Sequence, residues 1–387
     1  MDVKELVKDV KEYVIDLRRE FHMNPEPSWE EIRTSKRVME ELDKMGILHI
    51  SVAGTGVVAV IKGSQEGKTV ALRADMDALR INESNDVPYR SKNPGVMHAC
   101  GHDGHTAMLL GAAKILNDHK DEIKGTIKLF FQPAEETALG AGKLIVEGIM
   151  EGVDGIFGIH LWAGLPVGKV SVEAGPRMAS ADIFKIRVKG SGGHGSMPHQ
   201  AVDAIVTASA MVMELQSIVS REISPLETAV VSVGIFKSGT GFNIIASEAY
   251  LEGTTRSFDP SIRESLPNRI ERIAKNTASS HRAEAELEYI TGTPPVINDE
   301  SCAAIAQESM RKLFGDESII EMEKVMGAED FAMYLEMVPG MMAFVGAQNQ
   351  EIGACYPHHN ERFNIDEESL EIGTALYTQY ALDFLNK

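Results

Sequence analysis

The chain has 387 residues, enough for two or three domains, and its apolar share of 43% and charged share of 25% are those of folded globular proteins. Lys and Arg number 38 against 57 Asp and Glu, a formal charge of −19, which argues against a nucleic acid partner because such binders need a basic face. The three cysteines are too few and too scattered for a disulfide framework, so a reducing compartment is expected.

The N-terminal segment predicts two amphipathic helices within residues 1–46, broken at the Asn-Pro-Glu-Pro sequence of residues 24–27. It is charged throughout, and no part of the chain offers the continuous apolar stretch of a signal peptide or the roughly 20 apolar residues of a spanning helix. We therefore expect a cytoplasmic protein without a membrane partner.

Apolar runs that alternate with helical patterns follow. They predict strands over residues 56–63, 69–77, 126–133 and 155–161, with helices over 105–120 and 138–150. This order is typical of an α/β sheet covered by helices on both faces. Ligands of such sheets collect where strands end, and the polar motifs of this chain fall at those ends.

From about residue 180 the pattern changes to a half-buried, alternating strand over residues 182–190. A helix (201–219), two strands (228–236 and 249–258), a helix (261–280) and a strand (283–290) complete a β-α-β-β-α-β order, which is ferredoxin-like. The α/β pattern then resumes with a strand over 341–347 and a closing helix over 366–385. The sequence thus predicts a discontinuous domain (1–180 and 293–387) interrupted by an inserted one (181–292).

The densest chemical signal is Met-His-Ala-Cys-Gly-His-Asp-Gly-His at residues 97–105, which holds three of the twelve histidines. Imidazole and thiolate suit zinc and similar transition metal ions, so the segment predicts metal ligation. Two alternatives stay open at this point. Asp103 could simply be the N-cap of the following helix, and Cys100 could be a nucleophile activated by a nearby histidine.

Three weaker signals lie in other loops of the same domain. Glu135 and Glu136 follow an apolar strand, and such a pair can supply one metal ligand and one general base, or only a helix start favoured by the helix dipole. His160 ends a buried run, and His358 and His359 lie near the C-terminus. Each histidine alone would more often be a hydrogen-bonded core residue, but together these sites predict one centre with His, Cys and Glu ligands.

Residues 190–195 match the dinucleotide pattern G-x-G-x-x-G. That fingerprint needs a buried parallel strand before it and a helix that opens at its third glycine. Here the preceding strand alternates, and Ser-Met-Pro at 196–198 delays the helix. We interpret the segment as a glycine-rich turn that presents His194.

Five motifs, in the same order along nearly the whole chain, carry a family resemblance: RADMDAL (73–79), MHACGHDGHTAMLLGAAK (97–114), FQPAEE (131–136), GGHGSMPH (192–199) and GAEDF (327–331). With them the chain resembles the metal-dependent amidohydrolase and carboxypeptidase family of hippurate hydrolases, N-acyl-L-amino acid amidohydrolases (aminoacylases) and indole-acetyl-amino acid hydrolases. The resemblance implies a metallopeptidase-like α/β catalytic domain with a mixed sheet, and an inserted ferredoxin-like α+β domain that serves as lid and dimerisation domain.

The resemblance also implies a dinuclear site with two divalent ions (zinc, manganese, cobalt or nickel) and a water nucleophile. By motif, Glu135 matches the general base and His194 a residue that reaches the substrate carbonyl. Asn243 and Arg256 match residues that hold the substrate. The metal ligands implied by the motifs are Cys100, His102, Glu136, His160 and His359, the last chosen over His358 because its spacing to Phe363 fits the family pattern.

The expected function is hydrolysis of the amide bond of N-acyl-L-amino acids, with an N-acetyl, N-benzoyl or similar group, to a carboxylate and a free amino acid. On the same scaffold, a carboxypeptidase, a dipeptidase or a biosynthetic deacetylase (for example of N-acetyl-diaminopimelate) stays open. A cysteine hydrolase using Cys100 and a non-catalytic metal binder are the alternatives of a different class. The expected partners are a small-molecule substrate and a second copy of the chain, in a homodimer or higher homo-oligomer, since the helix 201–219 is apolar on more than one face.

Overall fold

The computed structural model describes all 387 residues and divides into two compact units. The first unit comprises Met1–Gly175, Ile297–Glu323 and Asp330–Lys387, and the second comprises Pro176–Val296 and Lys324–Glu329. The first is α/β and the second is α+β, which confirms the predicted fold class. None of the helices combines the length and the hydrophobicity that crossing a bilayer requires.

A seven-stranded mixed sheet forms the centre of the first unit, in the order β1-β2-β4-β3-β5-β15-β6. Its four middle strands are parallel to one another, and the outer strands pair antiparallel. Residues 70–75 of β3 are all buried, as expected for a parallel strand with helices on both faces. The strands are β1 (Leu48–Val52), β2 (Gly56–Lys62), β3 (Gln65–Asp75), β4 (Lys124–Gln132), β5 (Gly155–Pro166), β6 (Val170–Ser171) and β15 (Gly340–Gln348).

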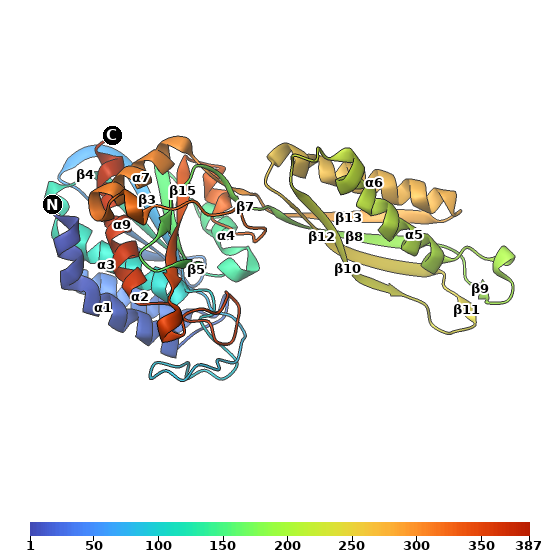
Figure 1. Cartoon of the computed structure of the whole chain (residues 1–387), viewed down its shortest axis with the longest axis horizontal. Helices are drawn as coiled ribbons and strands as arrows, with labels where there is room; N and C mark the ends of the chain where they lie inside the picture. Colours follow the sequence, from blue (N-terminus) through green and yellow to red (C-terminus); the bar gives the residue numbers. More distant parts are fainter. The chain divides into compact units, whose positions relative to one another are not determined.

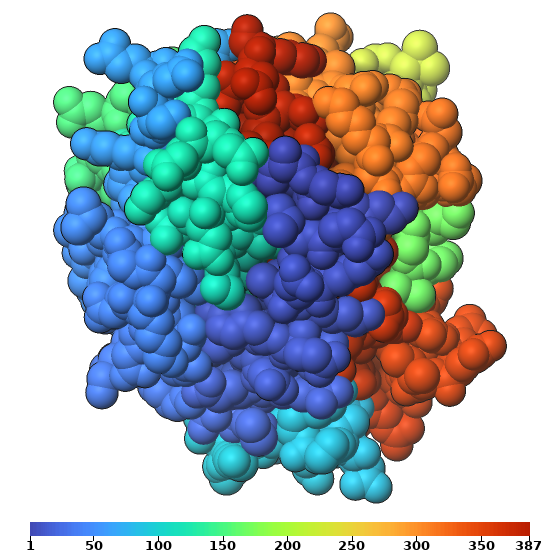
Figure 2. Space-filling model, turned by 90° about the vertical axis from the view of Figure 1, so that its left-hand side faces the viewer, coloured from blue at the N-terminus to red at the C-terminus, as the bar shows by residue number.

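Helices cover this sheet, and Figure 1 shows α1, α3 and α9 together on one side of it and α4 on the other. Helix α3 is buried along nearly its whole length, because it packs against the sheet, α1 and α9. In Figure 2, α1 (dark blue) covers the middle of one face beside α9 (red). The helices are α1 (Val3–Met23), α2 (Ile32–Met45), α3 (His102–Asp118), α4 (Gly140–Val146), α7 (Glu300–Phe314), α8 (Ala332–Leu335) and α9 (Glu368–Leu385).

The second unit is an antiparallel sheet in the order β10-β12-β8-β13 with α5 and α6 packed against it. This is the β-α-β-β-α-β arrangement that the sequence predicts. Alternate residues of β8 (Phe184, Ile186 and Val188) are fully buried in its core. The elements are β8 (Ala181–Lys189), α5 (Ala204–Ser217), β10 (Ala229–Ser238), β12 (Glu248–Ser257), α6 (Pro260–Ser280) and β13 (Glu284–Thr293).

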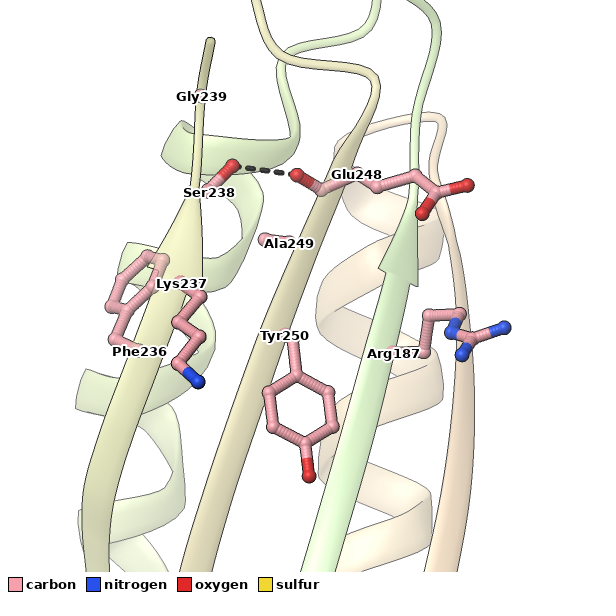
Figure 3. A pocket seen from close by; sticks show the side chains of 8 residues that line it. All are labelled: Arg187, Phe236, Lys237, Ser238, Gly239, Glu248, Ala249 and Tyr250. Carbon is pink, nitrogen blue, oxygen red and sulfur yellow. Dashed lines mark hydrogen bonds between the residues drawn. The ribbon is translucent and has the colours of Figure 1, made fainter.

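Two short ribbons complete the strands, one of β9 (Gly193–His194) with β11 (Ile244–Ile245) and one of β7 (Gly175–Met178) with β14 (Val296–Asn298). A pocket of about 580 Å³ lies on the second unit beside β10, β12 and β8, and Figure 3 shows its lining. The Ser238 hydroxyl donates to the Glu248 carbonyl there, at 2.6 Å. None of the predicted site residues lines this pocket.

Candidate metal centre

The predicted ligands of the first unit come from four segments that lie far apart in the sequence. Cys100 and His102 lie at the start of α3, and Glu135 and Glu136 form a turn just after β4. His160 lies on β5. The last segment is the loop before α9, which carries His359. The carboxyl ends of parallel strands meet at one edge of a sheet, which is why segments separated by up to 259 residues converge.

The ligand atoms gather into two groups that share one sulfur. In each group the atoms lie within 4.8 Å of one another, and the groups are Cys100 with His102 and His160, and Cys100 with Glu136 and His359. Cys100 Sγ lies 3.6 Å from His160 Nε2, and Glu136 Oε1 lies 3.4 Å from His359 Nε2. Two groups of nitrogen, sulfur and oxygen donors around a shared thiol suit a pair of borderline transition metal ions.

Two buried atoms of this centre lack the hydrogen-bond partner that a buried polar atom normally has. His102 Nε2 and Glu136 Oε1 are buried, have no hydrogen-bond partner and lie 4.0 Å apart. A buried polar atom without a partner costs about 1–3 kcal/mol. Both atoms carry lone pairs, so a cation between them would remove this cost. The donor set therefore fits divalent metal ions.

Backbone carbonyls orient the rings of two predicted ligands, His102 and His160, by bonding the ring nitrogen that faces away from the centre. His102 Nδ1–H donates to the Asp77 carbonyl at 2.9 Å, and His160 Nδ1–H donates to the Leu161 carbonyl at 2.7 Å. In the neutral form of both rings Nδ1 carries the hydrogen, so each Nε2 keeps a lone pair directed toward the centre. Both rings are thus in the tautomer that a metal ligand needs.

Asp77 is a site residue for which the sequence predicted no role. Its carboxylate accepts from the backbone N–H groups of Glu135 and Glu136, each at 3.1 Å, and from the Ser28 hydroxyl at 2.6 Å. It therefore holds the glutamate turn in place. Burial alone would raise the pKa of Asp77, but hydrogen bonding to His102 outweighs burial and lowers it. The available signal was its position at the end of the buried run 69–77.

The two neighbouring C-terminal histidines have different surroundings. His359 adopts a left-handed backbone with φ of 63°, and its imidazole faces Cys100 and Glu136. His358 packs against Trp162, and its Nε2 accepts from the Ala163 N–H at 3.2 Å, so that atom has no lone pair to spare. The geometry thus favours His359 over His358 as a ligand.

The pKa values of the centre report its negative charge and its burial. The neighbouring Cys100 and then Glu136 raise the pKa of His359 to about 10, because this position favours a cation. Burial lowers the pKa of His160, which keeps the ring neutral, as ligation requires. Burial also raises the pKa of the Cys100 thiol, which disfavours the free thiolate that a cysteine hydrolase would need.

One alternative that the sequence left open is wrong, and the rejection of another is confirmed. Asp103 does not cap α3, since the N-cap residue is Gly101, with a left-handed φ of 95°. Asp103 is instead buried and accepts from Arg18 Nε at 2.8 Å. The segment 190–195 has no dinucleotide geometry, because it contains the short strand β9 and is followed by a single 3₁₀ turn (Pro198–Gln200), with no α-helix before Ala204. Its rejection as a nucleotide site was correct.

The second unit carries the remaining predicted residues. His194 lies opposite Ile244 in the β9–β11 ribbon, and the Asn243 carbonyl accepts from the Gly195 N–H at 2.8 Å, so His194 and Asn243 are brought together. Arg256 is half-buried on β12 and donates to the Thr255 carbonyl at 2.9 Å. Its register opposite Val230 places it at the other end of β12 from Glu248, the residue at which the strand begins.

The comparisons with known proteins point to one family. Residues 71–383 match the sequence model of peptidase family M20/M25/M40. The chain is 42% identical over 390 residues to "Thermostable carboxypeptidase 2" of Saccharolobus solfataricus, covering 100% of this chain and 98% of that protein. It is 40% identical to "N-acetylcysteine deacetylase" of Bacillus subtilis, covering 95% and 96%. Among solved structures, a dinuclear metal binding peptidase of the M20 family from Bacillus subtilis superposes with a TM-score of 0.88 at 36% identity, covering 98% and 99%.

Proposed function

The chain belongs to peptidase family M20/M25/M40 and is a metal-dependent amide-bond hydrolase, and on that premise we propose that it cleaves N-acyl-L-amino acids. The observation that carries the proposal is the pair of ligand groups sharing Cys100, with the Glu135 carboxylate 4.0 Å from His102 Nε2. An N-acetyl or N-benzoyl amino acid joins an amide to a free carboxylate. A dipeptide offers the same two groups, and the likeness to a carboxypeptidase makes it the second candidate.

We assign five residues to two divalent ions: Cys100, His102, Glu136, His160 and His359. Zinc, manganese, cobalt or nickel would suit this mixture of thiolate, imidazole and carboxylate. When bound, the ions would polarise the amide carbonyl and lower the pKa of the attacking water. A reduced Cys100 is needed for this, which fits a reducing, cytoplasmic location; all three cysteines are free.

The remaining steps belong to residues of the chain. Glu135 accepts a proton from the attacking water and passes it to the amide nitrogen as the C–N bond breaks, so that the amine leaves uncharged and the acyl group leaves as the acid. His194 donates to the oxygen of the tetrahedral intermediate, and Asn243 holds the substrate beside it. Arg256 binds the substrate carboxylate, since no carboxylate lies within ion-pair distance of its guanidinium, whereas the nearby Asp182 is bound by Arg263 at 2.8 Å.

We further propose that the site is completed by a homodimer. Strand β12 runs from Glu248 near the β9–β11 ribbon to Arg256, eight residues later, a span of roughly 25 Å. One copy of the second unit cannot place both His194 and Arg256 on a single small substrate. A partner copy can supply His194 while Arg256 comes from the same chain.

The apolar surface of the second unit supports this assembly. Helix α5 exposes Ile205, Val206 and Met213, the last with 71% of its surface accessible, and β10 is an edge strand that exposes Ile235 and Phe236. An apolar helix face beside an unpaired strand edge is the surface that a symmetric dimer would cover.

Replacing each glutamate of the pair tests the assignment. Glu135→Gln should retain two metal ions and lose about 10²–10⁴-fold in kcat, because an amide cannot accept the proton. Glu136→Gln, the matched control, should lose metal as well. Metal analysis by mass spectrometry and kinetics with N-acetyl, N-benzoyl and dipeptide substrates measure both effects. Near-normal kcat in Glu135→Gln would refute the assignment of Glu135 as the general base. Metal loss in that variant would mean that Glu135 is the ligand and Glu136 the base.

A further inference from the structure

His105 is the third histidine of the segment 97–105, and both of its ring nitrogens are already bonded. Its Nδ1 lies 2.6 Å from Asp75 Oδ1, and its Nε2 accepts from the Leu161 N–H at 2.8 Å. A backbone N–H can only donate, so Nε2 is the acceptor and Nδ1 carries the hydrogen that Asp75 receives. Although His105 lies close enough to join a metal cluster, it has no lone pair left for an ion.

The hydrogen bond between the Leu161 N–H and His105 takes the place of one that a neighbouring strand would otherwise provide. β3 pairs with β5 only as far as Arg73 and Gly158, so beyond that point β3 supplies no acceptor for the Leu161 N–H. The His105 imidazole takes this place. It can do so because α3 lies very close to β5: a Cβ on Gly104 would come within 2.5 Å of the Leu161 side chain.

The carbonyl of the same residue, Leu161, then orients a predicted ligand ring. The Leu161 carbonyl accepts from His160 Nδ1–H at 2.7 Å, and His160 Nε2 lies 3.6 Å from Cys100 Sγ. At the other end of the chain of hydrogen bonds, Arg73 Nη1 donates to Asp75 Oδ2 at 2.6 Å in a pair that is almost wholly buried. The backbone of Leu161 thus links the hydrogen bonds of a buried carboxylate and His105 to the hydrogen bond of the His160 ring.

We propose that His105 is a positioning residue that, anchored by Asp75, holds the backbone of Leu161 and through it aims His160 Nε2 at the metal centre. This inference rests on the proposed function, because it takes His160 as a metal ligand. Residues that orient a ligand typically contribute about 10–100-fold to metal affinity. Removing the imidazole should therefore loosen one ion of the pair without removing any ligand.

The test measures binding of Zn²⁺ alone to the metal-free full-length protein, by competition with a chromophoric chelator. His105→Leu removes both hydrogen bonds and should weaken one of the two sites by about 10–100-fold. His105→Gln puts an amide oxygen at the position of Nε2, so it should restore part of this affinity by accepting from Leu161. The matched control is His98→Leu, since His98 is equally buried in the same segment and has no hydrogen-bond partner at either ring nitrogen.

Unfolding temperatures of the metal-free variants separate positioning from packing. His105→Leu and His98→Leu each replace a buried ring, but only the first should change Zn²⁺ affinity. Unchanged affinity in His105→Leu, or an equal loss in His98→Leu, would overturn the inference while leaving the proposed function intact. If His105→Leu does not fold, the Zn²⁺ affinity of His105→Gln is compared with that of His98→Leu in the same way. Failure of the wild-type protein to bind two equivalents of Zn²⁺ would instead overturn the proposed function.

Discussion

The buried ion pair between Arg18 and Asp103 ties α1 to the first turn of α3, and its removal has a calculable cost. Both side chains have no accessible surface, and Arg18 Nε lies 2.8 Å from Asp103 Oδ2. Burial alone would raise the pKa of Asp103, but Arg18 and then His22 outweigh it and lower that pKa well below its usual range. Asp103 is therefore ionised, and Asp103→Asn removes a charge and not merely a hydrogen-bond acceptor.

Two estimates of the effect agree. Unit charges about 4 Å apart attract by about 4 kcal/mol at an effective dielectric constant of about 20. Removal of one partner of a buried pair costs about 3–5 kcal/mol in measured cases. Here Asp103 is also the partner of His22, whereas Arg18 keeps a second carboxylate, Glu367, at 3.3 Å. Asp103→Asn should therefore lower the free energy of unfolding of the first unit by about 3–5 kcal/mol.

The control is the exposed pair of Arg80 and Glu30, whose atoms lie 2.6 Å apart but whose side chains are 69% and 59% accessible. Glu30→Gln makes the same chemical change and should cost less than about 1 kcal/mol. Only this smaller cost should shrink further in salt, which screens exposed charges more than buried ones.

Urea unfolding of the metal-free protein, followed by tryptophan fluorescence, measures both costs. The only two tryptophans, Trp29 and Trp162, lie in the first unit, so the signal reports that unit. A cost below about 1 kcal/mol for Asp103→Asn, or one equal to that of Glu30→Gln, would refute the argument from burial.

The other predictions concern histidines. His359→Ala should severely lower metal occupancy and activity, whereas His358→Ala should cost less than about 10-fold in either. Zn²⁺ titration and kcat compare the two variants, and the reverse order would make His358 the ligand. His194→Ala should lose about 10²–10³-fold in kcat with both metals retained. Mixing it with inactive Glu135→Gln subunits should restore activity, and no recovery despite confirmed subunit exchange would place His194 in its own chain's site. Burial opposes the charged form of His22, but hydrogen bonds to two buried carboxylates outweigh it and raise its pKa above 6.5. Its stabilisation is thus complete below about pH 6.5 and lost as pH rises through the raised value, so His22→Gln should flatten the fall in urea midpoint from about pH 6 to about pH 9. Parallel curves for the two proteins would contradict this.

Local pattern was enough for the fold class and for most elements. The buried runs near 69–77 and 126–133 became β3 and β4, and the alternation of 182–190 became β8 in a ferredoxin-like unit. These signals are periodicities of 2 or 3.6 residues, which survive in a single sequence. Strand β1 was not predicted, because it is an edge strand whose Leu48 is 79% exposed, so its pattern does not separate inside from outside.

The sequence by itself also determined which residue types could form the centre, since a run of His, Cys and Asp flanked by glycines, and a pair of glutamates after a strand, stand out in any context. Only the tertiary structure decided how they divide the work. His102 and His105 are both buried imidazoles three residues apart, yet the first has an unbonded Nε2 and the second has both nitrogens bonded. The difference lies in Asp75 and Leu161, which come from two other strands. Whether a ring nitrogen can bind a metal or only holds its neighbours in position depends on the hydrogen-bond partner that faces it. Packing between segments distant in the sequence sets that partner.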